Sequence, residues 1–113
     1  MKLELNGKEI EIDLLDADTL EKYGKAIEPL RKTIELNGDN AIVYVKSFCK
    51  VVYDFFDTLL GEGSAQMIFD GKQNMKLCND CILKCISSCE KYLINQFAKD
   101  ADKIINSWKE FLA

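Results

Sequence analysis

Residues 41–60 read AIVYVKSFCKVVYDFFDTLL and form the most apolar stretch of this 113-residue chain. Large apolar side chains recur there at the three- and four-residue spacing of an α-helix. The polar edge is narrow and consists of four residues: Lys46, Lys50, Asp54 and Asp57. A helix with so little polar surface is covered by other elements on several sides. The pattern therefore predicts a central helix over 41–60 that stops at Gly61-Glu62-Gly63, with Cys49 as a small core residue.

The first thirteen residues, MKLELNGKEIEID, predict a β-hairpin over 1–13. Asn6-Gly7 is the dipeptide that best supplies the two positive φ angles of a type I′ turn. A two-residue loop there pairs Leu3 with Ile10 and gathers the apolar side chains on one face. That face consists of Met1, Leu3, Ile10 and Ile12. Because an isolated hairpin is marginally stable, we expect this face to pack on helices or on a neighbouring subunit.

A kinked helix is predicted over 18–36, between the hairpin and the central helix. Asp18 and Glu21 have the spacing of a capping box at its start. Pro29 lacks an N–H and clashes with the preceding turn, so it predicts a kink or a restart after Glu28. Asn37-Gly38-Asp39-Asn40 predicts a helix end, a turn and the N-cap of the next helix.

After the central helix, a short helix is predicted over 64–69, ending at Asp70-Gly71. A helical pattern then covers 74–112 without Pro or Gly. A continuous helix of that length would extend for about 58 Å, more than the core of one small domain covers. We therefore expect it either to bend near Phe97–Asp102 or to project and pack on a partner. The predicted fold class is mainly α with an N-terminal β-hairpin (α+β), in a single domain over 1–113.

Composition excludes several classes of function. Hydrophobic residues make up 48% and charged residues 30%, which is typical of a globular chain. The net charge is -4, and the lysines are scattered among acidic residues, so a general nucleic-acid binder is disfavoured. No apolar run approaches the ~18 residues of a membrane-spanning helix. Histidine is absent and no nucleophile, base or phosphate-loop motif occurs, so we expect no enzyme and no cofactor.

The cysteines pose the one question of metal chemistry. Cys78, Cys81, Cys85 and Cys89 include a C-x2-C pair, which is a common half of a zinc or iron–sulfur site. On one helix, however, the four form a stripe whose ends lie about 16 Å apart, too far for one shared centre. We therefore expect a packing face and no metal. A metal- or redox-responsive helical module that uses this stripe is the alternative function.

An odd number of cysteines, five, and the absence of a secretory signal predict a reducing compartment, the cytoplasm.

The end of the chain is the best candidate for a binding surface. Residues 98–113 place their large apolar side chains on one side: Ile104, Ile105, Trp108, Phe111 and Leu112. Periodicity alone does not separate packing within the chain from packing between chains. Lysines alternate with acidic residues on the other side, which disfavours a membrane surface. We expect this segment to leave the body and pack against another copy, in a homo-oligomer whose partner-binding groove is built from the same helices.

The segment FFDTLLGEGSAQMIFDG, residues 55–71, resembles small prophage proteins of Gram-positive bacteria that look like tail assembly chaperones. The residues that carry the resemblance are Phe56, Asp57, Gly61, Gly63, Ile68, Phe69 and Gly71. The likeness covers roughly residues 1–97 and is specific only over 55–77. The cysteine stripe departs from it, because the relatives carry ordinary apolar residues there.

The resemblance implies a non-enzymatic protein that coats an apolar tape-measure protein until tail-tube subunits assemble around it. Partners would then be a tape-measure or tail-tube protein and further copies of the chain, with no nucleic acid and no membrane.

Overall fold

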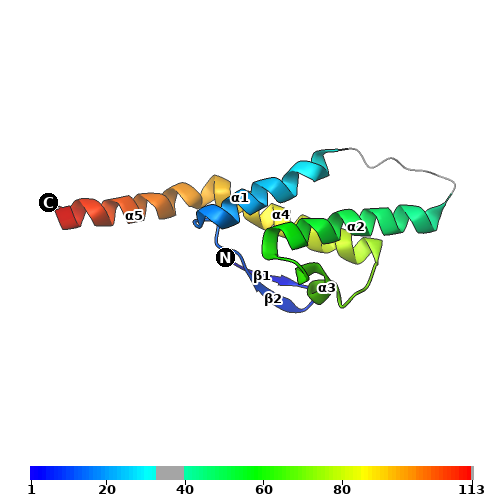
Figure 1. The fold of residues 1–113 in the computed structure, drawn as a ribbon. Helices are drawn as coiled ribbons and strands as arrows, with labels where there is room; N and C mark the ends of the chain where they lie inside the picture. The colour runs from blue at the N-terminus through cyan, green and yellow to red at the C-terminus, as the bar shows by residue number, and fades with distance from the viewer. Residues whose placement is uncertain (33–39, 113) are drawn as a thin grey trace.

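The structure is a computed structural model that describes residues 1–32 and 40–112, and most of it is helical (Figure 1). The elements, in chain order, are β1 (Lys2–Leu5), β2 (Lys8–Glu11), α1 (Ala17–Ile27), the 3-10 helix η1 (Glu28–Arg31), α2 (Ala41–Leu60), α3 (Ser64–Phe69), α4 (Met75–Asn95) and α5 (Phe97–Leu112). The predicted fold class, mainly α with an N-terminal β-hairpin, is confirmed. The described residues include no helix with both the length and the apolarity needed to cross a bilayer.

The hairpin has the predicted turn and register. Asn6 and Gly7 both adopt positive φ angles, 51° and 75°, and Leu3 lies opposite Ile10. The Ile12 amide donates to the Met1 carbonyl at 2.8 Å, which extends the pairing by one step. Leu3, Ile10 and Ile12 are buried, so the apolar face packs on the helices of the same chain.

The start of α1 differs from the prediction. Asp16, not Asp18, is the N-cap: its carboxylate accepts from the Thr19 amide at 3.0 Å and from the Thr19 hydroxyl at 2.9 Å. Asp18 lies inside the first turn, where its charge still favours the positive end of the helix dipole. Tyr23 then joins α1 to α4 through a 2.6 Å hydrogen bond that its hydroxyl donates to Glu90.

Pro29 ends the α-helix earlier than predicted. α1 stops at Ile27, η1 follows, and Lys32 is extended with ψ 135°, so the helix does not resume before the described part of the chain breaks off. The predicted helix end over 33–36 and the predicted turn Asn37-Gly38-Asp39 lie outside the described residues. Asn40 is the N-cap of α2, as predicted, and accepts from two amides of the first turn.

α2 has the predicted bounds but is covered over only part of its length. From Cys49 onward, α2 supplies the core with five buried side chains: Cys49, Val52, Phe55, Phe56 and Leu59. The first turn is exposed, with Ile42 at 68% and Val43 at 51%. The expectation of cover on several sides is therefore wrong for the first turn, because α1, α3 and α4 pack around the other end of α2 (Figure 1).

The predicted 74–112 helix is two helices. Gln96 leaves helical geometry, with φ −123°, between α4 and α5, one residue before the range in which we expected a bend. α5 extends away from the body and gives the molecule its long dimension, 68 Å against 27 and 21 Å (Figure 1).

Candidate protein-binding surface

The break at Gln96 sets the direction of α5 through a small polar network. The Tyr92 hydroxyl donates to Asp100 at 2.7 Å, and the Gln96 side-chain amide donates to the same carboxylate at 2.9 Å. The hydrogen bond to Asp100 raises the pKa of Tyr92 to about 12, and the Tyr92 hydroxyl lowers the pKa of Asp100. Tyr92 before the break, Gln96 at the break and Asp100 after it thus link α4 to α5.

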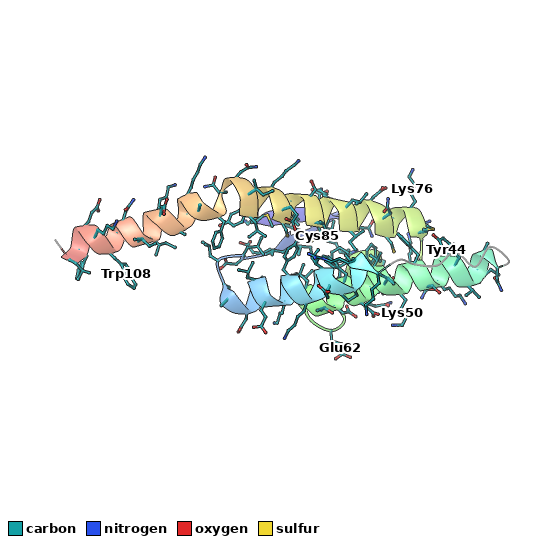
Figure 2. All side chains as sticks on the ribbon, turned by 90° about the horizontal axis from the view of Figure 1, so that it is seen from above. Tyr44, Lys50, Glu62, Lys76, Cys85 and Trp108 are labelled. Atoms are coloured by element: carbon teal, nitrogen blue, oxygen red, sulfur yellow. The ribbon has the colours of Figure 1, made fainter. Side chains whose placement is uncertain are left out.

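α5 projects with its apolar face uncovered. None of its sixteen residues, all of which the structure describes, is buried. The five residues predicted as the binding surface are exposed by half or more: Ile104 50%, Ile105 51%, Trp108 70%, Phe111 90% and Leu112 77%. Figure 2 shows Trp108 near the far end of this helix, away from the body. We call these five residues the α5 face.

The α5 face is large for a monomer. With about 200 Å² for each large side chain, the exposed fractions amount to roughly 700 Å² of apolar surface. That is above the range of the largest apolar patch on a typical monomer, about 300–600 Å², and such patches are often functional. At its tip, a shallow hollow of 340 Å³ is lined by Trp108, Phe111 and Leu112. An exposed apolar surface of this size favours binding to another molecule.

The rest of α5 favours a protein partner over a lipid surface. Its other side carries both signs of charge in equal number: Lys99, Lys103, Lys109, Asp100, Asp102 and Glu110. An interfacial membrane helix is rich in Lys and Arg on its polar face, so that anionic headgroups attract it. The balanced charge of α5 supplies no such attraction.

The segment that resembles prophage proteins, residues 55–71, is called the phage-like segment. It lies away from α5 and forms a corner of the core. Phe56 and Phe69 are fully buried with ring centroids 5.6 Å apart. Asp57 caps α3 by accepting from the Ala65 amide at 2.9 Å. The glycines of the segment adopt positive φ angles: Gly61 108°, Gly63 88° and Gly71 74°. The structure thus does not bring this segment together with the α5 face, and the segment acts by shaping the body.

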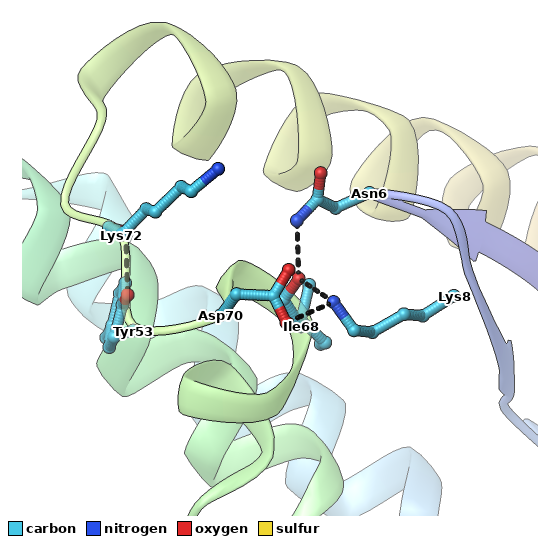
Figure 3. Close-up of polar contacts among 6 residues, drawn as sticks. All are labelled: Asn6, Lys8, Tyr53, Ile68, Asp70 and Lys72. Carbon is cyan, nitrogen blue, oxygen red and sulfur yellow. Dashed lines mark hydrogen bonds and ion pairs between the residues drawn. The ribbon is translucent and has the colours of Figure 1, made fainter.

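Sequence reasoning missed how the hairpin is joined to this corner. The Asn6 side chain donates to the Ile68 carbonyl at 2.8 Å, and Lys8 donates to that carbonyl at 3.1 Å and to Asp70 at 2.9 Å (Figure 3). Nearby, the Tyr53 hydroxyl donates to the Lys72 carbonyl at 2.7 Å (Figure 3). The contacts of Asn6 and Lys8 join positions about 60 residues apart, and no local sequence pattern predicts them.

The cysteine stripe faces the core. All five cysteines are free and buried, and Figure 2 places Cys85 on the inner side of α4. Burial and a contact with Cys49 raise the pKa of Cys78 to about 12, and burial also raises the pKa of Cys81. The hydrogen bond with Cys85 lowers the pKa of Cys89, but Cys89 is fully buried, whereas a reactive cysteine combines a lowered pKa with an accessible thiolate. Among the described residues, no three His, Cys, Asp or Glu side chains gather as a metal site would require. The burial of all four residues of the stripe favours its interpretation as a packing face.

Comparison with known proteins gives a family without an assigned activity. A family model described as "Family of unknown function (DUF6673)" matches residues 6–110. No curated protein and no solved structure matches the chain.

Proposed function

The chain belongs to DUF6673, and we propose that it is a non-enzymatic tail-morphogenesis protein of a phage or prophage, an assembly chaperone that binds a helical partner. The partner class is a tape-measure or tail-tube protein, met in the host-cell cytoplasm. The observation that carries the proposal is the α5 face, an apolar helix surface held away from the body. The resemblance of residues 55–77 to prophage tail assembly chaperones supports the phage or prophage part of the proposal.

The spacing of the α5 face suits a partner helix. Ile104, Trp108 and Phe111 stand at i, i+4 and i+7, the anchor spacing with which amphipathic helices bind apolar surfaces. Aromatic anchors dominate such contacts, at about 2 kcal/mol or more each when truncated. An interface with about 700 Å² on one side is at the small end of specific complexes.

The chemistry of the chain supports binding rather than catalysis. There is no histidine to act as a general base, and the thiols that could act as nucleophiles are all buried. The same burial weighs against the alternative of a redox- or metal-responsive module, because such a module needs access to its sulfur atoms.

Gene neighbourhood and co-expression test this function together. We expect a very long gene for a helical, apolar polypeptide beside the gene for this chain. Expressed alone, that polypeptide aggregates; with this chain it stays in the supernatant. The Trp108→Ala/Phe111→Ala double variant loses this effect, while Met67→Ala, which removes a half-exposed apolar side chain from α3, keeps it. A metabolic neighbourhood, or equal rescue by the double variant, would contradict the proposal.

A further inference from the structure

The turn of the hairpin contains a chemically labile pair, Asn6-Gly7. An asparagine side chain can react with the backbone nitrogen of the next residue, and the reaction is fastest when that residue is glycine, because glycine has no side chain to shield its nitrogen. Both residues are exposed and both adopt positive φ angles. A Cβ atom added to Gly7 would meet no atom within 4 Å, so no neighbour shields this position either. The pair that the turn requires is therefore open to water and to this reaction.

The fold holds the Asn6 side chain on α3. Its amide nitrogen Nδ2 donates to the Ile68 carbonyl at 2.8 Å (Figure 3). The Lys8 ammonium donates to the same carbonyl at 3.1 Å and to the Asp70 carboxylate at 2.9 Å, which ties the other side of the turn to the same place. The reaction requires the Asn6 side chain to fold back onto the Gly7 nitrogen. The side chain must therefore first leave α3.

We infer that Asn6 is a site of spontaneous deamidation, that its hydrogen bond to α3 keeps it unreacted in the folded chain, and that its conversion releases the hairpin from α3. The inference is independent of the proposed function, because these residues belong to the body and not to the α5 face.

The reaction needs water and no other reagent. The Gly7 nitrogen gives up its proton to the solvent and forms a bond to Cγ of Asn6. The bond from Cγ to Nδ2 breaks, and Nδ2 takes up a proton and leaves as ammonia. Water then opens the resulting cyclic imide at either of its C–N bonds, which yields aspartate or isoaspartate at position 6. In total, an amide and water become a carboxylate and an ammonium ion, without an oxidant, a cofactor or an enzyme.

Both products remove the donor on which the contact with α3 depends. A carboxylate only accepts hydrogen bonds, so it repels the Ile68 carbonyl and competes with Asp70 for Lys8. Isoaspartate also leads the main chain through the former side chain, which adds a backbone atom to a two-residue turn. Because the turn fixes the register, this change acts on the pairs behind it, such as Leu3 with Ile10. Isoaspartate is therefore expected to loosen the hairpin more than aspartate does.

Peptide mapping by mass spectrometry tests the protection by the fold. The full chain is kept at pH 8 with and without urea, and the mass gain from amide to acid is followed at Asn6. Conversion in buffer is expected to be at least about tenfold slower than in urea, which corresponds to about 1.4 kcal/mol for opening the turn. Asn79, which is followed by Asp80, is the internal control and should react far more slowly in urea. The map must separate Asn6 from Asn37, which also precedes a glycine and lies outside the described residues. Equal rates at Asn6 in buffer and urea would overturn the inference, and so would no conversion in urea.

Lys8→Met tests whether the contact with α3 sets the rate. The variant loses both bonds of Lys8 and should convert Asn6 about three- to tenfold faster in buffer, with no change of rate in urea. The fully buried Cys49 should stay unreactive toward a thiol reagent, which separates local opening of the turn from global unfolding. Lys2→Met is the matched control on the same hairpin, where Lys2 pairs with Glu9, and should leave the rate unchanged. An unchanged rate in Lys8→Met, or a rise that appears only together with a reactive Cys49, would refute protection by this contact.

Asn6→Asp tests the consequence, because it supplies the aspartate product directly. Asp-Gly also supports the type I′ turn, so the variant keeps the turn and loses the donor. Its urea midpoint should fall by about 0.5–1 M, because the Ile68 carbonyl loses a partner. Asn6→Gly loses the same donor without adding a charge and should fall by less. A wild-type midpoint for Asn6→Asp would refute the claim that conversion releases the hairpin.

Discussion

Truncation of Phe69 gives the sharpest test of how the body is built. Phe69 ends α3, is fully buried, stacks on Tyr53 at 5.2 Å and meets the edge of Phe56 at 5.6 Å. Phe69→Ala removes that burial and both ring contacts and leaves a cavity. Losses of this kind cost about 3–5 kcal/mol. A domain of this size is stable by about 5–15 kcal/mol, so the variant should remain folded with a much smaller margin.

Urea unfolding followed by circular dichroism measures this loss. With a slope of about 2 kcal/mol per molar urea, a loss of about 4 kcal/mol lowers the midpoint by about 2 M. Met67→Ala is the matched control, because Met67 stands two residues earlier in α3 and is 49% exposed. Its midpoint should fall by less than about 0.5 M. Equal shifts for the two variants, or a shift below 0.5 M for Phe69→Ala, would refute the core described here.

Three further predictions concern the hairpin and the thiols. Leu3→Asp should cost about 2–4 kcal/mol in urea unfolding, because it buries an unpaired charge at a site that is 7% exposed; an unchanged midpoint would remove the hairpin from the core. None of the five thiols should react with a thiol-specific disulfide reagent at pH 8 in the native state, and all five should react in urea; one fast native thiol would contradict their burial. The raised pKa of Cys78, about 12 against 9.0, means that between these pH values the folded chain keeps a proton which the unfolded chain loses. The free energy of unfolding should therefore be constant below pH 9 and fall between pH 9 and 12 by up to about 1.4 kcal/mol per pH unit. Cys78→Ala should reduce this slope, and an identical slope would contradict the cause given.

Local chemistry made several elements predictable from the sequence. Asn6-Gly7 specifies one turn type, and the turn fixes the register that buries Leu3 and Ile10. Asn40 caps the start of α2, and Gly61 ends the helix. In each case the deciding residues are neighbours in the chain, so the pattern alone is sufficient.

The incorrect predictions have a common cause: the local sequence allows two alternatives, and tertiary contacts decide between them. Asp16-x-x-Thr19 and Asp18-x-x-Glu21 both have the spacing of a cap, and Leu14, buried just before them, accompanies the earlier start. Likewise, α2 and α5 both show apolar periodicity, but the body covers Phe56 and leaves Trp108 in water. Periodicity reports that a face is apolar and does not report what covers it. The contacts of Asn6 with the far end of α3 had no local signal at all.

The emission of Trp108, the single tryptophan of the chain, tests the central claim most directly, because it reports the α5 face without any label. The claim is that this face leaves the body and is covered only by another molecule. At high dilution, Trp108 should emit at the long wavelength of a water-exposed indole and be quenched freely by iodide. When the helical partner polypeptide is added, the emission should shift to shorter wavelength and the quenching should fall. A short-wavelength emission of the free chain would place the face against its own body, and a long-wavelength emission that the partner does not change would leave the face without an occupant. Either result would contradict the account.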